Sequence, residues 1–251
     1  MDMDTNTTQM SYTFKERHYT DRHSFVVALA EDWEYGKNAL SDGTLHHYFC
    51  TEHPDLAELC KKAEETILAE PMDAEVIFLD FLYQLDPLLI GFYKKGRFYD
   101  SFSAFGEEML EMLYADDTSE QPYWDSILHQ RILTKYMERL FGNTEYLQKA
   151  EVLENMLTDE DMDQRSLLLR DYAMAYLIAD DIFFRINDQK LRNVSELTQY
   201  MKDLLEQSYE AFEDFCHTLV DYNDVLDVQL EAFLLALGKQ KELLLWREGL
   251  S

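Results

Sequence analysis

The sequence contains little proline, glycine, cysteine or positive charge. Four prolines and eight glycines among 251 residues leave few points at which a helix must end, and no proline follows Pro122. Long helices are therefore expected to dominate, above all in the second half. Three cysteines, an odd number without a C-x-x-C spacing, fit a reducing compartment and provide no disulfide framework.

Two further absences limit the class of protein. Residues 1–9 are polar and acidic, without the basic and apolar stretches of a signal peptide. The longest apolar runs, such as residues 233–237, are far shorter than a membrane span. These absences predict a soluble cytoplasmic protein that has no membrane partner.

Acidic residues outnumber basic ones by 50 to 22, which gives a formal net charge of −28. A field of that sign repels phosphates and anionic lipids, so direct binding to nucleic acid or membranes is not expected. Two interpretations of the acidity remain: a solubilising helical surface, or a surface directed at a basic partner. Apolar residues make up 47% of the chain, so it is expected to bury a core despite its charge.

A faint internal repetition is the most informative pattern that is present. Apolar positions between Tyr83 and Leu113 recur 92 residues later, between Ala175 and Leu205. A weaker third copy begins earlier in the chain, at Tyr19, and matches the copy between Tyr83 and Leu113 at an offset of 80 residues. Similarity at a fixed period indicates reiterated structural units. Such repetition suits a binding scaffold better than a single catalytic centre.

Each copy contains two short aromatic or apolar runs around a turn, which is the pattern of a small β-hairpin. The paired runs are residues 12–14 with 18–20, 91–93 with 97–99, and 183–186 with 190–192. A two-stranded hairpin is marginally stable in water, so each should pack on helices. The side chains expected to make that contact are Phe92, Phe98 and Phe184.

We therefore predict a mainly α fold, a multi-helix array or bundle with two or three small β-hairpins in internally repeated hairpin–helix units. The longest predicted helices cover residues 22–40, 55–68, 73–85, 123–141 and 164–182. The polar stretch from Ala115 to Pro122 is the candidate domain boundary. It divides the chain into an N-terminal half at 1–115 and a C-terminal half at 116–251, with one continuous domain as the alternative.

Histidine and cysteine gather in one place, at His46, His47, Cys50 and His53. His46 and Cys50 are one helical turn apart and could share a zinc ion. His53 lies seven positions from His46, about 10 Å along a helix axis, and Pro54 disfavours a helical conformation at His53. Because three ligands do not converge, we predict no metal and no other cofactor.

Other patterns of catalytic chemistry are missing or incomplete. Asp180 and Asp181 resemble part of a metal–diphosphate motif, but adjacent helical residues diverge by about 100°. A solvated helix end, or an ion pair between Asp181 and Arg185 at i,i+4, is the predicted arrangement. The chain contains no nucleophile elbow, phosphate-binding loop or zinc-protease motif. We therefore predict that the protein is not an enzyme.

The segment 207–236 holds seven acidic residues and no lysine or arginine. Like charges three or four positions apart destabilise a helix by about 0.2–0.5 kcal/mol per pair. Either tertiary packing compensates for this cost, or the charges serve a cationic partner. The predicted partner-binding residues are Glu210, Glu213, Asp214, Asp221, Asp224, Asp227 and Glu231.

Three stretches combine turn glycines, helix caps and core aromatics. They contain Leu29, Trp33, Gly36, Leu40, Asp42, Gly43, Leu45, Tyr48 and Phe49; Leu85, Asp86, Pro87, Phe92, Gly96, Phe98, Ser101, Phe105 and Gly106; and Leu226, Asp227, Phe233, Leu234, Gly238 and Trp246. This combination resembles a family of poorly characterised bacterial helical modules that accompany kinase-like or chaperone-like domains. The resemblance implies a regulatory or scaffolding role and carries over no catalytic residue.

The predicted function is a non-enzymatic protein-interaction or regulatory scaffold that holds a protein partner with a basic surface. The alternative is an acidic mimic of nucleic acid that inhibits a basic nuclease, regulator or defence enzyme. Self-association into a homo-oligomer is a further expectation, because 14% of the residues are aromatic.

Overall fold

A computed structural model describes residues 11–89, 91–142, 145–156, 162–221 and 224–250. Within these ranges, fourteen α-helices and three two-stranded antiparallel hairpins confirm the mainly α fold. The segment 1–9, on which the absence of a signal peptide is predicted, lies outside the described residues. Among the described helices, none is both long and apolar enough to cross a membrane.

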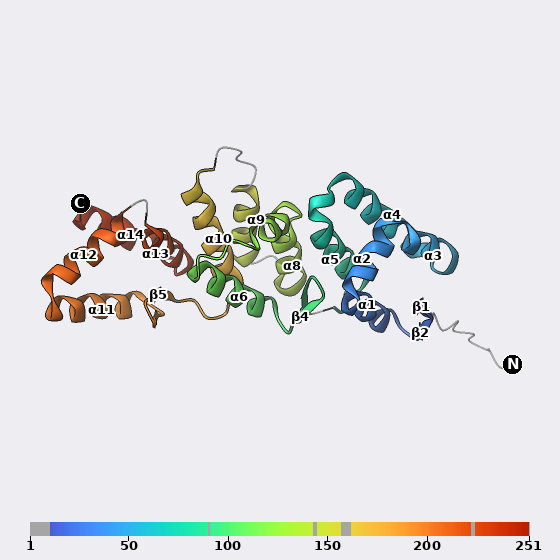
Figure 1. Ribbon diagram of the computed structural model, residues 1–251, viewed down its shortest axis with the longest axis horizontal. Helices are drawn as coiled ribbons and strands as arrows, with labels where there is room; N and C mark the ends of the chain where they lie inside the picture. Colours follow the sequence, from blue (N-terminus) through green and yellow to red (C-terminus); the bar gives the residue numbers. More distant parts are fainter. Residues whose placement is uncertain (1–10, 90, 143–144, 157–161, 222–223, 251) are drawn as a thin grey trace. The chain divides into compact units, whose positions relative to one another are not determined.

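The chain forms two compact parts, Met1–Ser101 and Phe102–Ser251 (Figure 1). The helix at Phe102–Tyr114 therefore belongs to the C-terminal part, whereas the sequence-based division at residue 115 places it in the first half. That division into folding domains stays a prediction.

The N-terminal part contains two hairpins and five helices in its described residues. Its elements are β1 (Tyr12–Phe14), β2 (Arg17–Tyr19), α1 (Arg22–Glu31), α2 (Trp33–Ser41), α3 (Thr44–Glu52), α4 (Pro54–Ala69), α5 (Ala74–Leu85), β3 (Phe92–Lys94) and β4 (Arg97–Tyr99). Helix α4 packs between α3 and α5, and α5 also packs on α1. The core is strongly aromatic, with Phe25, Phe49 and Phe78 fully buried.

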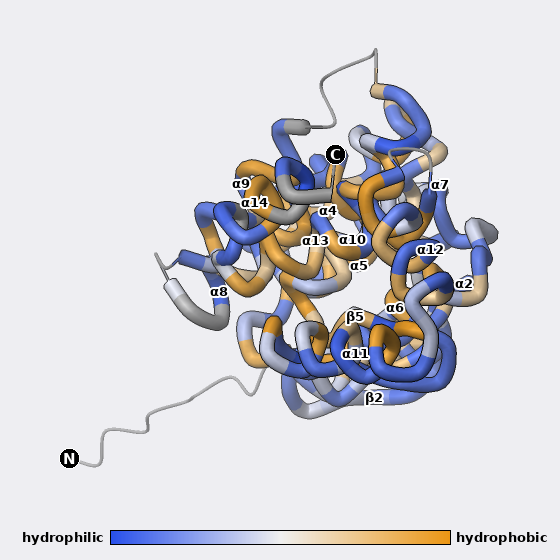
Figure 2. The backbone as a smooth tube through the Cα atoms, turned by 90° about the vertical axis from the view of Figure 1, so that its left-hand side faces the viewer, coloured by the Kyte–Doolittle hydropathy of each residue, from blue (hydrophilic) through white to orange (hydrophobic). Residues whose placement is uncertain are grey.

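The C-terminal part contains one hairpin and nine helices in its described residues. Its elements are α6 (Phe102–Tyr114), α7 (Gln121–His129), α8 (Ile132–Phe141), α9 (Glu145–Met156), α10 (Gln164–Ile178), β5 (Phe184–Ile186), β6 (Gln189–Leu191), α11 (Val194–Gln207), α12 (Tyr209–Val220), α13 (Val225–Ala236) and α14 (Gln240–Leu250). Helix α10 lies at the centre, because it packs on α6, α9 and α13. In Figure 2, α13 is hydrophobic along most of its length, whereas α11 alternates between hydrophobic and hydrophilic segments.

The three hairpins share one design. Each has three-residue strands joined by a two-residue loop, and each is followed by a helix two residues after its second strand. The strands of the second hairpin lie 80 residues after those of the first, and those of the third lie 92 residues after the second. Lys95 and Gly96, in the second loop, both have positive φ (50° and 83°), as the tightest hairpin turns require.

The expected anchors of the hairpins are confirmed at two of three positions. Phe92 and Phe184 are fully buried, but Phe98 is 52% exposed. In the β3–β4 ladder, Phe92 lies opposite Tyr99 and Tyr93 lies opposite Phe98. Because neighbouring residues of a strand point to opposite faces, Phe92 and Tyr99 share one face of the hairpin and Phe98 points to the other.

Two of the predicted long helices are each divided in the structure. The helix expected at 22–40 is split into α1 and α2 at Asp32, and the helix expected at 123–141 is split into α7 and α8 around Arg131. Arg131 adopts a left-handed conformation with φ of 56°. Neither break contains the glycine or proline by which a helix end is usually recognised.

Candidate functional site

The weak metal candidates His46 and Cys50 both lie on α3. His46 Nδ1 is 3.5 Å from a carboxylate oxygen of Glu64, and Cys50 is exposed. His53 lies beyond the end of α3, where its Nε2 donates to the backbone oxygen of Ser11 at 3.0 Å. Within the described residues, His46 and Cys50 join no group of three possible metal ligands.

Burial sets the order in which the three thiols should react. Cys50 is exposed, whereas Cys60 and Cys216 are buried. Burial, with smaller contributions from Glu64 and Cys50, raises the pKa of Cys60 to about 12. Cys60 therefore stays protonated near pH 8, and only a thiolate is nucleophilic. With a chromogenic disulfide reagent we expect one rapidly reacting thiol per chain, which the Cys50→Ser variant loses. A second rapid thiol in the native protein would contradict this order.

Asp181 and Arg185 do not form the predicted i,i+4 pair. Helix α10 ends at Ile178, so neither residue is helical. The side chain of Asp181 instead accepts two hydrogen bonds from Arg192, at 2.9 and 2.8 Å. Arg185 pairs with Glu111 on α6 at 2.8 Å. These bonds tie the third hairpin to the residues around it.

The seven predicted partner-binding acids are not on one surface. Asp227 is 1% exposed and Glu231 is half-buried, both on α13. Asp224 caps the same helix, since its carboxylate accepts from the backbone N–H of Leu226 at 2.7 Å. The four others, Glu210, Glu213, Asp214 and Asp221, are exposed. The acidic surface is therefore smaller than the sequence predicts.

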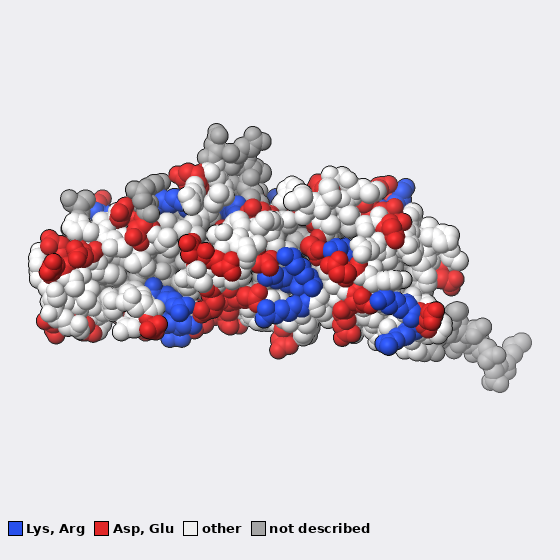
Figure 3. Space-filling model, viewed as in Figure 1, with Lys and Arg blue, Asp and Glu red and all other residues white. Residues whose placement is uncertain are grey.

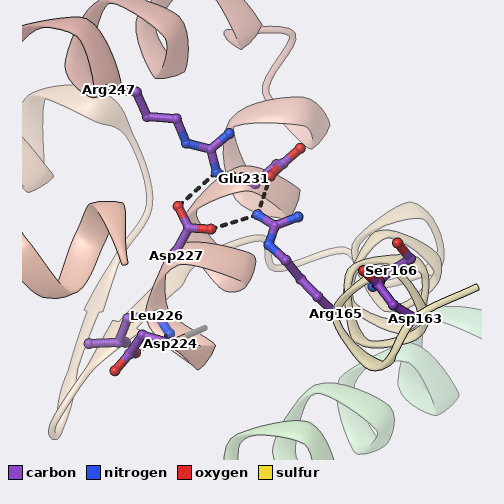
Figure 4. Close-up of polar contacts among 8 residues, drawn as sticks. All are labelled: Asp163, Arg165, Ser166, Asp224, Leu226, Asp227, Glu231 and Arg247. Carbon is purple, nitrogen blue, oxygen red and sulfur yellow. Dashed lines mark hydrogen bonds and ion pairs between the residues drawn. The ribbon is translucent and has the colours of Figure 1, made fainter. Parts of the chain in front are cut away.

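Two arginines neutralise Asp227 and Glu231, as Figure 4 shows. Arg165, on α10, donates to Asp227 at 2.6 Å and to Glu231 at 2.5 Å. Arg247, on α14, donates to the same two carboxylates at 2.7 and 3.0 Å. Burial would raise the pKa of Glu231, but the hydrogen bonds and charges of the arginines outweigh it and lower the pKa from its ordinary value of 4.5. This four-residue charge cluster joins three helices and is structural.

The exposed acids that remain form the acidic face of α12, which we define as Glu210, Glu213 and Asp214. All three are exposed, and within the described part of the chain they make no ion pair. On a helix they cover one side, because positions three and four apart are neighbours. Acidic side chains gather over α12 at the left of Figure 3. This face carries a concentrated negative charge with no counterion in the part of the chain that the structure describes.

An apolar side chain borders the acidic face. Tyr209, the first residue of α12, is 66% exposed, and Leu205, near the end of α11, is 44% exposed. Glu206 lies between them and is also exposed without an ion pair among the described residues. The acidic segment of the sequence shows the charges but not these neighbours, because exposure of a tyrosine or leucine cannot be read from a helical pattern alone.

A separate groove of about 470 Å³ lies between α9, α10 and α13. Its rim carries Glu145 and Lys149, which pair with each other at 2.8 Å. Its apolar lining consists of Val152, Leu153, Ala173, Leu177, Ile182, Ala232, Leu235 and Ala236. A groove of this size and character is typical of small-molecule sites. Sequence reasoning missed it because its walls come from three helices spread over some ninety positions.

The comparisons with known proteins do not extend these observations. No protein family matches the chain, and no curated protein and no solved structure is significantly similar to it.

Proposed function

We propose that the protein is a protein-interaction module that binds a basic segment of a partner protein on the acidic face of α12. One observation carries the proposal: Glu210, Glu213 and Asp214 are exposed and, among the described residues, have no cationic partner. Elsewhere in the C-terminal part, arginines neutralise acids of the same segment. Helix α12 keeps its charges for an external cation.

Electrostatics supports this proposal in two ways. A net charge of −28 attracts a basic partner from a distance and speeds its association. The acidic face then concentrates three charges on one side of a twelve-residue helix. Helix α12 itself contains no lysine or arginine, and α11 contains one, Lys202. The alternative function, a mimic of nucleic acid, stays a prediction.

Reversal of the three charges is expected to remove binding. The probe is a fluorescently labelled lysine-rich peptide without an apolar face, and the measurement is fluorescence anisotropy with the full chain. We expect the Glu210→Lys/Glu213→Lys/Asp214→Lys variant to bind at least about tenfold more weakly, because electrostatic attraction becomes repulsion. Affinity of the unmodified chain should fall steeply between about 50 and 200 mM salt.

A matched variant separates a site from general attraction. Glu16, Glu52 and Glu58 in the N-terminal part are also exposed and, within the described residues, make no ion pair. Reversal of these three to lysine changes the net charge by the same amount and is expected to leave the affinity within about threefold. Equal losses in both triple variants would mean that net charge alone attracts the peptide, and the proposed function would then fail.

A further inference from the structure

The helix after each hairpin offers an internal comparison. In α1 and α6, the residues at the same register are fully buried or nearly so. They are Phe25, Val26, Leu29 and Ala30 in α1 with Trp33 at the start of α2, and Phe105, Gly106, Met109, Leu110 and Leu113 in α6. In both cases the covering element is the helix that precedes the next hairpin, since α5 packs on α1 and α10 packs on α6.

Helix α11 lacks such a cover in the described part of the chain. The five positions of α11 that correspond to the buried positions of α6 are Leu197, Thr198, Met201, Lys202 and Leu205. Among these five, only Leu197 is buried. Thr198 and Met201 are half-buried, and Lys202 and Leu205 are exposed. The main packing partners of α11 are α12 and β6. A face that is covered by a helix in the two preceding units is therefore open in the third.

The open face carries Met201 and Leu205 together with Lys202, and exposed acids stand next to it along the chain. Met201 and Leu205 are one helical turn apart on α11, and exposed Tyr209 begins α12 just after the extended residue Ser208. Glu206 and Glu210 follow Leu205 and Tyr209 in the chain, and both are exposed without an ion pair among the described residues. An occupant that satisfies both features has an apolar stripe flanked by lysine or arginine.

The covered helices indicate how closely a helix could approach α11. On α6, a helix lies so close that a Cβ placed on Gly106 would be 2.6 Å from Cγ1 of Ile178. At the same register α11 has Thr198 and α1 has Val26, which α5 covers. A helix that docks on α11 would therefore lie farther from α11 than α10 lies from α6, because Thr198 has a side chain where Gly106 has none. Helix α1 shows that a helix can still cover a face with a side chain at this position, since α5 packs on α1, where Val26 is buried.

We propose that α11 and the first residue of α12 bind a basic amphipathic helix of a protein partner, in the position that α10 occupies on α6. The inference rests on the proposed function for the charge of the partner and adds its secondary structure. Helix α11 has 14 residues, about 21 Å at 1.5 Å per residue, so a partner helix of about 15 residues covers it. Recognition of an apolar stripe on one helix by a groove or face of another is a recurring mode of peptide binding.

Two synthetic peptides of the same composition test the inference. Both contain about 18 residues of leucine, lysine and alanine, but only one places leucine at i, i+3, i+4 and i+7. With the full chain in fluorescence anisotropy, we expect the amphipathic peptide to bind at least about tenfold more tightly than the scrambled one. The Leu205→Asp variant should remove this difference and leave the affinity for the scrambled peptide within about twofold. Because Leu205 is exposed, the substitution is compatible with folding.

A second exposed apolar pair provides the control. Leu244 and Leu245 on α14 are 60% and 64% exposed, and the Leu244→Asp/Leu245→Asp variant should bind both peptides like the unmodified chain. Equal affinity for the two peptides overturns the inference and leaves the proposed function in place. If neither peptide binds, both the inference and the proposed function are overturned. A loss in the Leu244→Asp/Leu245→Asp variant as large as that in Leu205→Asp would show a non-specific apolar contact and overturn the docking site.

Discussion

Replacement of Asp227 by alanine is expected to lower the free energy of unfolding by about 3 kcal/mol. The carboxylate is 1% exposed and accepts hydrogen bonds from both Arg165 and Arg247. Without it, two partly buried guanidinium groups share the single carboxylate of Glu231. The estimate lies at the low end of the range for broken buried ion pairs because Glu231 remains. Urea unfolding followed by far-ultraviolet circular dichroism measures the change.

The control for Asp227 is an acid of the same segment with no internal role. Asp214 is exposed and makes no ion pair within the described residues, so Asp214→Ala should change the stability by less than about 0.5 kcal/mol. A double-mutant cycle with Arg165→Met isolates the pair, since contacting residues are not additive. If Asp227→Ala proved as mild as Asp214→Ala, the charge cluster would not hold α10, α13 and α14 together.

The same comparison explains what the acidic segment could and could not reveal. Its seven acids are alike in the sequence, yet Asp227 is buried and Glu231 half-buried, whereas Glu210 and Glu213 are exposed. The partner of Asp227 is Arg165, 62 positions away, and local spacing carries no information on such a contact. One signal was present: α13 is apolar on most sides, so two acids at i,i+4 on it had no exposed side to occupy.

The hairpins were predictable because their signals are local. Two short apolar runs around a two-residue turn define each of them, and their spacing places all three strand pairs to within one residue of the structure. The helix breaks at Asp32 and Arg131 were not predictable, since both residues are compatible with a helix interior. At Arg131 the backbone is left-handed, a conformation uncommon for a residue other than glycine, and α7 and α8 pack on each other across this break.

The open face of α11 was hidden from the sequence for a different reason. The repetition in the sequence aligns Met201 with Met109 and Leu205 with Leu113, and both Met109 and Leu113 are buried core residues of α6. Similarity of pattern therefore predicts a buried face on α11 as well. Whether a helix covers that face depends on the elements around it, and only the structure supplies them. The departure from the pattern, Lys202 in place of Leu110, was the one local hint.

Replacement of Gly106 by valine is expected to destabilise the protein by about 3 kcal/mol. A Cβ at this position would lie 2.7 Å from the backbone nitrogen of Ala179 as well as 2.6 Å from the side chain of Ile178. The backbone of Ala179 cannot yield easily, because its N–H donates to Ala175 at 2.9 Å. Helix α10 must therefore move away from α6, which opens the centre of the C-terminal part. Urea unfolding again provides the measurement.

The equivalent substitution on α11 is the matched control. Thr198 has the register of Gly106 but is half-buried, and no helix of the α10 type lies over it in the described chain. Thr198→Val should therefore change the stability by less than about 0.5 kcal/mol. A contrast between the two positions means that the same face is closed on α6 and open on α11, which is the physical basis of the docking site. If valine were tolerated at both positions, α6 and α10 would not be in tight contact at Gly106, and the comparison with α11 would fail.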